Sequence, residues 1–250
     1  MLSSIYQQWR GRGRTEITPI ADAFFPPLLV RKPDEWTNAT HRVAYIGQET
    51  LGWSWTQRDV AEYGYTWGYE DIETLHKFLE YDRSVEALID GYGQFNFAAR
   101  QPLSYRSPFW QYFRRLTASL GKKGDEVSAV FSNVIRCAAN SEVGFTLWSI
   151  SEKDRARYLQ WQKGLLQAEL TELLPTLIVF LTGPYYDDYL RSEFDEISFE
   201  PLGSFEPRVV SKLKSAMLTA PAYRTYHPGY LNRTVGFAPL EAIIADALKR

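Results

Sequence analysis

The sequence predicts an α/β protein: a three-layer α/β/α arrangement with a short, mainly parallel, four-stranded central sheet. Three observations predict it. Four short runs of β-branched and aromatic residues are spaced along the chain, stretches with helical periodicity lie between them, and glycine stops two of the runs. Strands that alternate with helices imply crossover connections and a parallel sheet covered on both faces.

The strands are expected where β-branched and aromatic residues run together. In chain order these runs are Val43–Ile46, Val127–Ile135, Thr176–Leu181 and Tyr223–Tyr226. The first is stopped by Gly47 and the third by Gly183, a pattern typical of buried parallel strands that end in loops. The stretch 184–221 is less readable and adds no strand to the prediction.

The expected helices are defined by their capping residues. They are Asp71–Ile89, Phe109–Leu120, Ser151–Leu174 and a C-terminal helix that begins at Pro239. Ser107 and Pro108 open the second helix as an N-cap and an N1 proline. Ser151 and Asp154 have the spacing of a capping box at the start of the third.

The length of the chain allows one domain with a sizeable core. It has 250 residues, of which 45% are hydrophobic, and nothing in that length requires a second domain. Residues 1–40 are expected to form an irregular N-terminal arm packed on the domain, because arginines alternate with glycines there and the Phe24–Pro27 segment cannot lie inside a helix or a central strand. Residues 41–250 then form the single domain.

Composition excludes several classes of protein. Cys137 is the only cysteine, which excludes an intramolecular disulfide, a cysteine-rich zinc site and a four-cysteine iron–sulfur cluster. The first residues lack an apolar leader, and the longest apolar run, Leu177–Leu181, is too short to span a bilayer. We therefore expect a cytoplasmic protein with no membrane partner.

The charge balance and the aromatic content limit how the protein could bind nucleic acid. Lys and Arg total 28 against 30 Asp and Glu, so any binding to nucleic acid must come from a local patch. Aromatic residues make up 15% of the chain. Several alternate between residues 53 and 69, which favours a role in the core or as a cover over base stacking.

Polar side chains of three kinds lie in the expected strands or directly after them. Gln48 and Glu49 follow the first strand, Asn133 lies in the second and His227 follows the fourth. Ligands of parallel sheets bind beyond the carboxyl ends of the strands. An acid, an amide and an imidazole are the groups needed to break a sugar–base bond: a carboxylate steadies the sugar cation or positions water, an imidazole donates to the base oxygen, and an amide reads the base edge.

Each of these residues also has a structural alternative. Glu49 could cap the N-terminus of a following helix. His227 could be a loop histidine with satisfied hydrogen bonds, and Asn133 could be bound by the main chain. The sequence leaves these alternatives open.

The order of the motifs resembles the uracil-DNA glycosylase superfamily, whose members carry an early Gly-Gln-Asp-Pro-Tyr-His motif and a late His-Pro-Ser-Pro-Leu-Ser motif. The corresponding stretches here are Gly47-Gln48-Glu49-Thr50-Leu51-Gly52 and His227-Pro228-Gly229-Tyr230-Leu231-Asn232. Ser107-Pro108-Phe109 and the strand that carries Asn133 lie between them in a similar order. The similarity spans residues 42–233 as short motifs.

The resemblance implies roles for the strand-end residues. Glu49 stands where the water-activating acid lies, with Gln48 beside it. His227 would be the electrophile for the base oxygen, and Asn133 would read the amide-like edge of a uracil-type base.

The resemblance also implies DNA contacts. Leu231 matches the wedge leucine that props the duplex open. Ser107, Pro108 and Gly229 would hold phosphates, with Arg233 nearby. The stacking aromatic has no motif of its own, and the candidates are Phe95 and Phe97.

Two positions depart from the family pattern. Glu49 replaces an aspartate, so its carboxylate reaches one methylene further, and Leu51 replaces the tyrosine that excludes a 5-methyl group. The identity of the recognised base is therefore not fixed by the sequence: it is uracil or a related modified base.

The expected function is that of a monofunctional DNA glycosylase in DNA repair. It would flip the base out of single- or double-stranded DNA and hydrolyse its N-glycosidic bond as a monomer, without metal or organic cofactor. One alternative is a catalytically weak or inactive module that binds modified DNA bases. Another is a protein-interaction domain, which the near-neutral charge favours.

Overall fold

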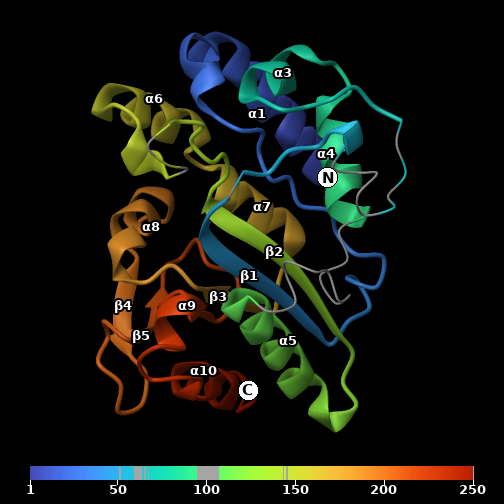
Figure 1. Cartoon of the computed structure of the whole chain (residues 1–250). Coiled ribbons are helices and arrows are strands. Elements are labelled where there is room, and N and C mark those ends of the chain that lie inside the picture. The colour runs from blue at the N-terminus through green and yellow to red at the C-terminus, as the bar shows by residue number, and fades with distance from the viewer. Residues whose placement is uncertain are drawn as a thin grey trace. The chain divides into compact units, whose positions relative to one another are not determined.

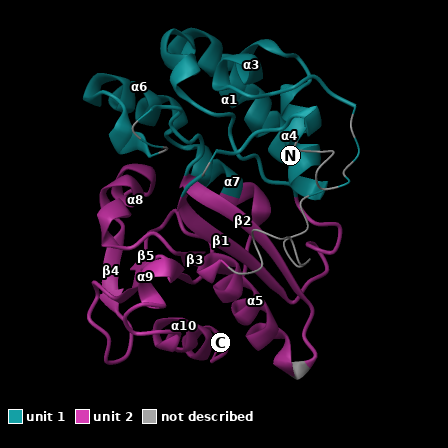
Figure 2. Cartoon of the chain, viewed as in Figure 1, with its two compact units in different colours: residues 1–31, 49–95, 135–169 teal, residues 32–48, 96–134, 170–250 magenta. Residues whose placement is uncertain are grey.

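The computed structural model describes residues 1–50, 52–58, 64, 66, 68–94, 107–142, 144 and 146–249 (Figure 1). The chain divides into two compact units (Figure 2). Unit 1 comprises residues 1–31, 49–95 and 135–169, and unit 2 comprises residues 32–48, 96–134 and 170–250. The expected arm, residues 1–40, and the expected domain, residues 41–250, each contribute to both units. None of the helices formed by the described residues is long and apolar enough to cross a membrane.

Unit 2 is built on a six-stranded mixed sheet in the order β2-β1-β3-β6-β5-β4. The strands are β1 (His41–Glu49), β2 (Val127–Ile135), β3 (Leu177–Phe180), β4 (Ser198–Pro201), β5 (Val210–Lys214) and β6 (Ala222–Thr225). Only the last residues of β1 and β2 belong to unit 1. β3 pairs in parallel with β1 and with β6, whereas β5 is antiparallel to β6 and to β4.

The α/β class is confirmed, and so are the positions of the four expected strands, but the expectation of a four-stranded, mainly parallel sheet is wrong. The antiparallel strands β4 and β5 extend the sheet at one side. Neither has the pattern of a half-buried strand. The buried apolar residues of β5, Val210 and Leu213, are three positions apart, and all of β4 is at least partly exposed.

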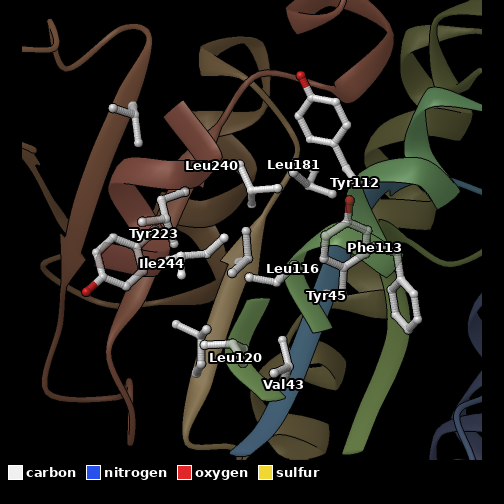
Figure 3. Packing of buried hydrophobic residues seen from close by; sticks show 14 of the residues in the cluster. Val43, Tyr45, Tyr112, Phe113, Leu116, Leu120, Leu181, Tyr223, Leu240 and Ile244 are labelled. Atoms are coloured by element: carbon white, nitrogen blue, oxygen red, sulfur yellow. The ribbon is translucent and has the colours of Figure 1, made fainter. Parts of the chain in front are cut away.

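Helices cover both faces of this sheet within unit 2. On one face α5 (Pro108–Leu120), α9 (Pro228–Leu231) and α10 (Ala238–Ala247) pack on alternate strand residues such as Val43, Tyr45 and Val179 (Figure 3). On the other face lies α8 (Asp187–Glu193). Phe194, the residue directly after α8, packs edge to face against Phe180 of β3, with ring centroids 6.1 Å apart. α5 begins at the expected N-cap, Ser107, and ends at the expected residue.

Unit 1 is mainly helical among its described residues. Its helices are α1 (Leu2–Glu16), α3 (Leu75–Glu80), α4 (Ser84–Gln94), α6 (Glu152–Gln162) and the first part of α7 (Leu165–Leu173). Short 3-10 segments in the chain are Thr18–Ala23, Gly121–Lys123, Leu147–Ser149 and Pro184–Tyr186.

The expectation of an irregular arm is wrong for the residues of α1. Tyr6, Trp9, Arg10 and Gly13 are buried at helical spacing on one face of this helix. The rings of Trp9 and Trp161 stack at 4.0 Å, and each indole N–H donates to the other residue's carbonyl oxygen. A Cβ at position 13 would lie 2.9 Å from the Trp161 ring. Packing against tryptophan therefore explains why a glycine, which lowers helix propensity, lies in this helix.

Two expected helices are each divided in two. Ser151 caps α6 as expected by accepting a hydrogen bond from the Asp154 N–H at 3.1 Å. The helix stops at Gln162, and Gly164 has a φ of +84° before α7 begins. The expected helix 71–89 is likewise replaced by α3 and α4, where Thr74 caps α3.

A buried charge pair lies in the core of unit 1. Arg136 and Glu169 form an ion pair with side chains 0% and 1% exposed, and the Tyr6 hydroxyl donates to the second Glu169 oxygen at 2.7 Å. Burial raises the pKa of Tyr6 well above its ordinary value, and Glu169 adds to that rise. Next in the chain, Cys137 is fully buried, which raises the pKa of its thiol to about 12.

Candidate active site

Gly47 of β1 lies directly beneath one expected site residue of unit 2, Asn133, and beneath two aromatic rings. A Cβ at this position would lie 2.3 Å from Oδ1 of Asn133, 3.3 Å from the Phe109 ring and 3.4 Å from the Phe131 ring. Such distances leave no room for a side chain. Glycine is therefore required here so that an amide and two aromatic rings can lie directly on the strand.

Asn133 lies inside this aromatic group and is only 2% exposed. Phe131 precedes it by two residues on β2, so both side chains lie on the same face of the sheet. The Phe109 and Phe131 rings meet edge to face, with centroids 5.0 Å apart. The amide expected at the carboxyl end of β2 is thus buried, and its Oδ1 lies over the same strand position as the two rings.

His227 approaches the same group through Phe109. The imidazole stacks on the Phe109 ring with centroids 5.9 Å apart and an interplanar angle of 22°. Its Nδ1 accepts a hydrogen bond from the Gly229 N–H at 3.1 Å, which makes His227 the N-cap of α9. Phe109 is therefore shared by the amide and the imidazole.

The protonation state of His227 follows from these contacts. Burial lowers the pKa of His227, and the positive charge of Arg233 lowers it further. The side chain is then neutral at pH 7. Because Nδ1 accepts from Gly229, the hydrogen bond assigns the single proton to Nε2, which is left as a hydrogen-bond donor.

Gln48 connects two neighbouring strands. Its side-chain Nε2 donates to the Thr182 carbonyl oxygen at 2.8 Å, so it ties the end of β1 to the residues that follow β3. The Thr182 hydroxyl is fully buried and has no hydrogen-bond partner among the residues that the structure describes. A buried polar atom of this kind calls for a water molecule or a ligand.

Glu49 belongs to unit 1, whereas Gln48, Asn133 and His227 belong to unit 2. Its Oε2 accepts a hydrogen bond from the Leu147 N–H at 2.9 Å. Leu147 begins the short 3-10 segment Leu147–Ser149. One oxygen of Glu49 thus caps the first N–H of a short helical segment, which is the structural alternative that the sequence left open.

The residues expected to hold phosphate differ in exposure and in whether their hydrogen-bond donors are already in use. Ser107 and Pro108 are the N-cap and first residue of α5, and the Ser107 carbonyl oxygen accepts from the Gln111 N–H. Arg233 is exposed. The N–H of Gly229, in contrast, already donates to His227, so this donor is in use.

Leu231, the expected wedge, does not protrude from the surface of unit 2. Its side chain is 0% exposed and lies in the apolar cluster formed with α5 and α10. A wedge residue must reach out of the surface to enter a base stack. The adjacent Tyr230 is 45% exposed instead.

Some residues were missed by the sequence analysis, and others cannot be placed. Phe109 and Phe131 enclose the amide but were not selected as stacking residues. Their signals were the Ser-Pro-Phe order at the start of α5 and the two-residue spacing from Asn133. The selected candidates, Phe95 and Phe97, lie outside the described residues, as does Leu51.

The arrangement supplies polar groups without an evident metal site. Among the described residues no group of three or more His, Cys, Asp or Glu side chains is placed to hold a metal ion. Comparison of the sequence with models of known protein families gives no match, and comparison with curated proteins gives none.

Proposed function

We propose that the chain is a DNA glycosylase-like hydrolase that removes uracil or a related modified base from DNA. One observation carries this proposal: a neutral imidazole with its proton on Nε2, His227, and a buried amide, Asn133, gather around one aromatic ring, Phe109. An amide and an aromatic ring can recognise a nucleobase, and a neutral imidazole can stabilise the negative charge that develops on the departing base.

The chemistry follows from where charge develops. As the bond between C1′ of the sugar and the base nitrogen breaks, positive charge grows on the sugar and negative charge on the base. The Nε2–H of His227 would donate a hydrogen bond to the base oxygen that gains negative charge. Water then adds its oxygen to C1′, and its proton balances the charge of the departing base.

Recognition of the base would come from Asn133 and the rings around it. A carboxamide presents a donor and an acceptor side by side, which complements the adjacent acceptor and donor on a uracil-type base edge. Phe131, which is only partly buried, offers apolar ring surface for the flipped base and is backed by Phe109. The role of Glu49 of unit 1 as the acid that positions water stays a prediction from the sequence.

The test is base release from oligonucleotides that carry one uracil or one hypoxanthine, single-stranded and double-stranded, with alkaline cleavage as the readout for the abasic product. Loss of the imidazole in His227→Ala is expected to slow release by about a hundredfold or more, because one preorganised donor to the developing charge is removed. His76→Ala, at a surface histidine beside Glu80 in unit 1, is the matched control and should release base at the wild-type rate. Release unaffected by both His227→Ala and Glu49→Gln would reject the assignment.

A second candidate is a module that binds modified DNA bases without cleaving them. The observation that favours it is the hydrogen bond from the Leu147 N–H to Glu49, because the oxygen that accepts this bond is already engaged. Tight binding to a uracil-containing strand with no abasic product after prolonged incubation would select this candidate.

A further inference from the structure

Unit 2 carries a surface of tyrosines and arginine that the proposed chemistry does not use. It consists of Tyr185, Arg208, Tyr226 and Tyr230, which we name the Tyr–Arg surface. Tyr185 lies in the 3-10 segment after β3, Arg208 lies between β4 and β5, Tyr226 follows β6 and Tyr230 is in α9. Segments distant in sequence thus bring the four residues together.

Contacts among the four residues form a continuous series. The Tyr226 and Tyr230 rings lie 4.4 Å apart at an angle of 32°. The Arg208 guanidinium lies 5.7 Å from the centre of the Tyr185 ring. Arg208 also interacts with the hydroxyls of Tyr226 and then Tyr185, which raises the pKa of Arg208. Arg208 therefore connects Tyr185 to the tyrosine pair.

The backbone beneath this surface is fixed. The Arg208 carbonyl oxygen accepts a hydrogen bond at 2.9 Å from Arg224, a buried residue that is held in turn by both carboxylate oxygens of Asp187. Gly183 has a φ of +67°, and a Cβ there would lie 3.0 Å from the Tyr226 ring. The rings are thus presented by an ordered support.

Exposure and charge distinguish this surface from ordinary packing. Tyr185 is 73% exposed and Tyr230 is 45% exposed. Arg208 forms no ion pair with a carboxylate within the described parts of the chain, so tyrosines surround its charge without neutralising it. Exposed rings beside a free cation fit a ligand that is both flat and anionic.

We propose that the Tyr–Arg surface binds the unpaired bases of single-stranded DNA next to the base that is removed. Exposed tyrosine rings stack on bases of any sequence, and a guanidinium contacts the phosphates between them. Tyr226 directly precedes His227 and Tyr230 follows it by three residues, so the surface adjoins the imidazole. This inference rests on the proposed function and extends it to a preference for single strands, because paired bases cannot stack on the rings.

The experiment measures fluorescence anisotropy with undamaged, labelled oligonucleotides of about 15 nucleotides, enough to cover a single-strand site. Three probes are used: oligothymidylate, a duplex of the same length, and a single strand of abasic deoxyribose phosphates. Tyr185→Ala and Tyr230→Ala are each expected to weaken oligothymidylate binding about 5- to 150-fold and to leave binding of the abasic strand unchanged. Arg208→Ala should weaken both and reduce the salt dependence.

The matched control is Trp148→Ala in unit 1, where a 60% exposed indole lies 4.7 Å from Arg155. This variant should bind oligothymidylate like the wild type. Equal wild-type binding of oligothymidylate and the abasic strand, or tighter binding of the duplex, would overturn the inference. Uracil release without any effect of the tyrosine variants on binding would refute this inference alone, and tyrosine-dependent binding without release would refute the proposed function alone.

Discussion

Arg136 of unit 1 and Arg208 of unit 2 lie in opposite environments. In unit 1, Arg136 is fully buried and paired with the carboxylate of Glu169, whose other oxygen accepts from Tyr6. In unit 2, Arg208 lies among the tyrosines of an exposed surface, and no carboxylate of the described residues pairs with it. A buried and neutralised charge holds a fold together, whereas an exposed charge beside aromatic rings is available for a ligand.

Aromatic residues show the same difference. Trp9 and Trp161 of unit 1 stack on each other and satisfy each other's indole N–H groups. Tyr185 and Tyr230 of unit 2 leave much of their rings exposed. The comparison separates rings whose polar groups are satisfied inside the fold from exposed rings, which in our proposal are available to a ligand.

The largest effect is expected where the buried charge pair of unit 1 is broken. Glu169→Gln leaves the Arg136 charge buried without its counterion, and we expect a loss of about 3–5 kcal/mol in the free energy of unfolding. Urea denaturation followed by circular dichroism measures it. Glu70→Gln, in the exposed pair with Lys77 in unit 1, should leave the midpoint unchanged. A Glu169 variant as stable as the wild type would show that the buried ion pair does not stabilise the fold.

A smaller effect is expected at the strand on which the site of unit 2 closes. In Gly47→Ala the new methyl group would lie 2.3 Å from Oδ1 of Asn133, so the amide must move. We expect a loss of about 1–3 kcal/mol in stability and a loss of base release, measured by denaturation and by the uracil assay. Gly11→Ala is the control: nothing lies within 4 Å of its Cβ in α1, so the stability should rise by about 0.5–1 kcal/mol. Full activity in Gly47→Ala would show that the position of the amide is not critical.

The smallest effect is a dependence of stability on pH at His227. The pKa of this imidazole in the folded protein is lowered by burial, so as the pH falls the unfolded chain takes up the proton first. Stability is therefore complete above the ordinary histidine pKa of about 6.5 and decreases as the pH falls below it. In His227→Asn the amide oxygen can still cap the Gly229 N–H but does not titrate. The melting temperature of this variant should decrease less between neutral and acidic pH, and an identical decrease in both proteins would contradict the assigned neutral state.

The fold could be predicted where local signals agree with tertiary packing. The second strand, Val127–Ile135, was predicted to the residue, and Ser107 with Pro108 located the start of α5. The prediction failed where tertiary contacts decide. α1 contains Gly11 and Gly13, which lower helix propensity, yet its buried face packs on Trp161. The edge strand β4 contains Pro201 and partly exposed residues, so its sequence carries no strand period.

The candidate site could be predicted only in part, for a related reason. Strand order places Asn133 and His227 at the carboxyl ends of their strands, and the structure brings both to Phe109. Which leucine is exposed cannot be read from a motif: Leu231 fills the core because α9 turns it toward α5 and α10. The cap that Glu49 provides for Leu147 depends on a segment about a hundred residues away in the chain, a distance at which sequence periodicity carries no information.

The burial of Cys137 makes the protein well suited to site-directed labelling. Its thiol is the only one in the chain, it is enclosed in unit 1, and its raised pKa keeps it protonated at neutral pH. Maleimides and iodoacetamides react with accessible thiolates, so the folded wild-type protein should remain unmodified. A cysteine introduced at an exposed position would then carry a fluorophore or spin label by itself, without prior removal of the native residue.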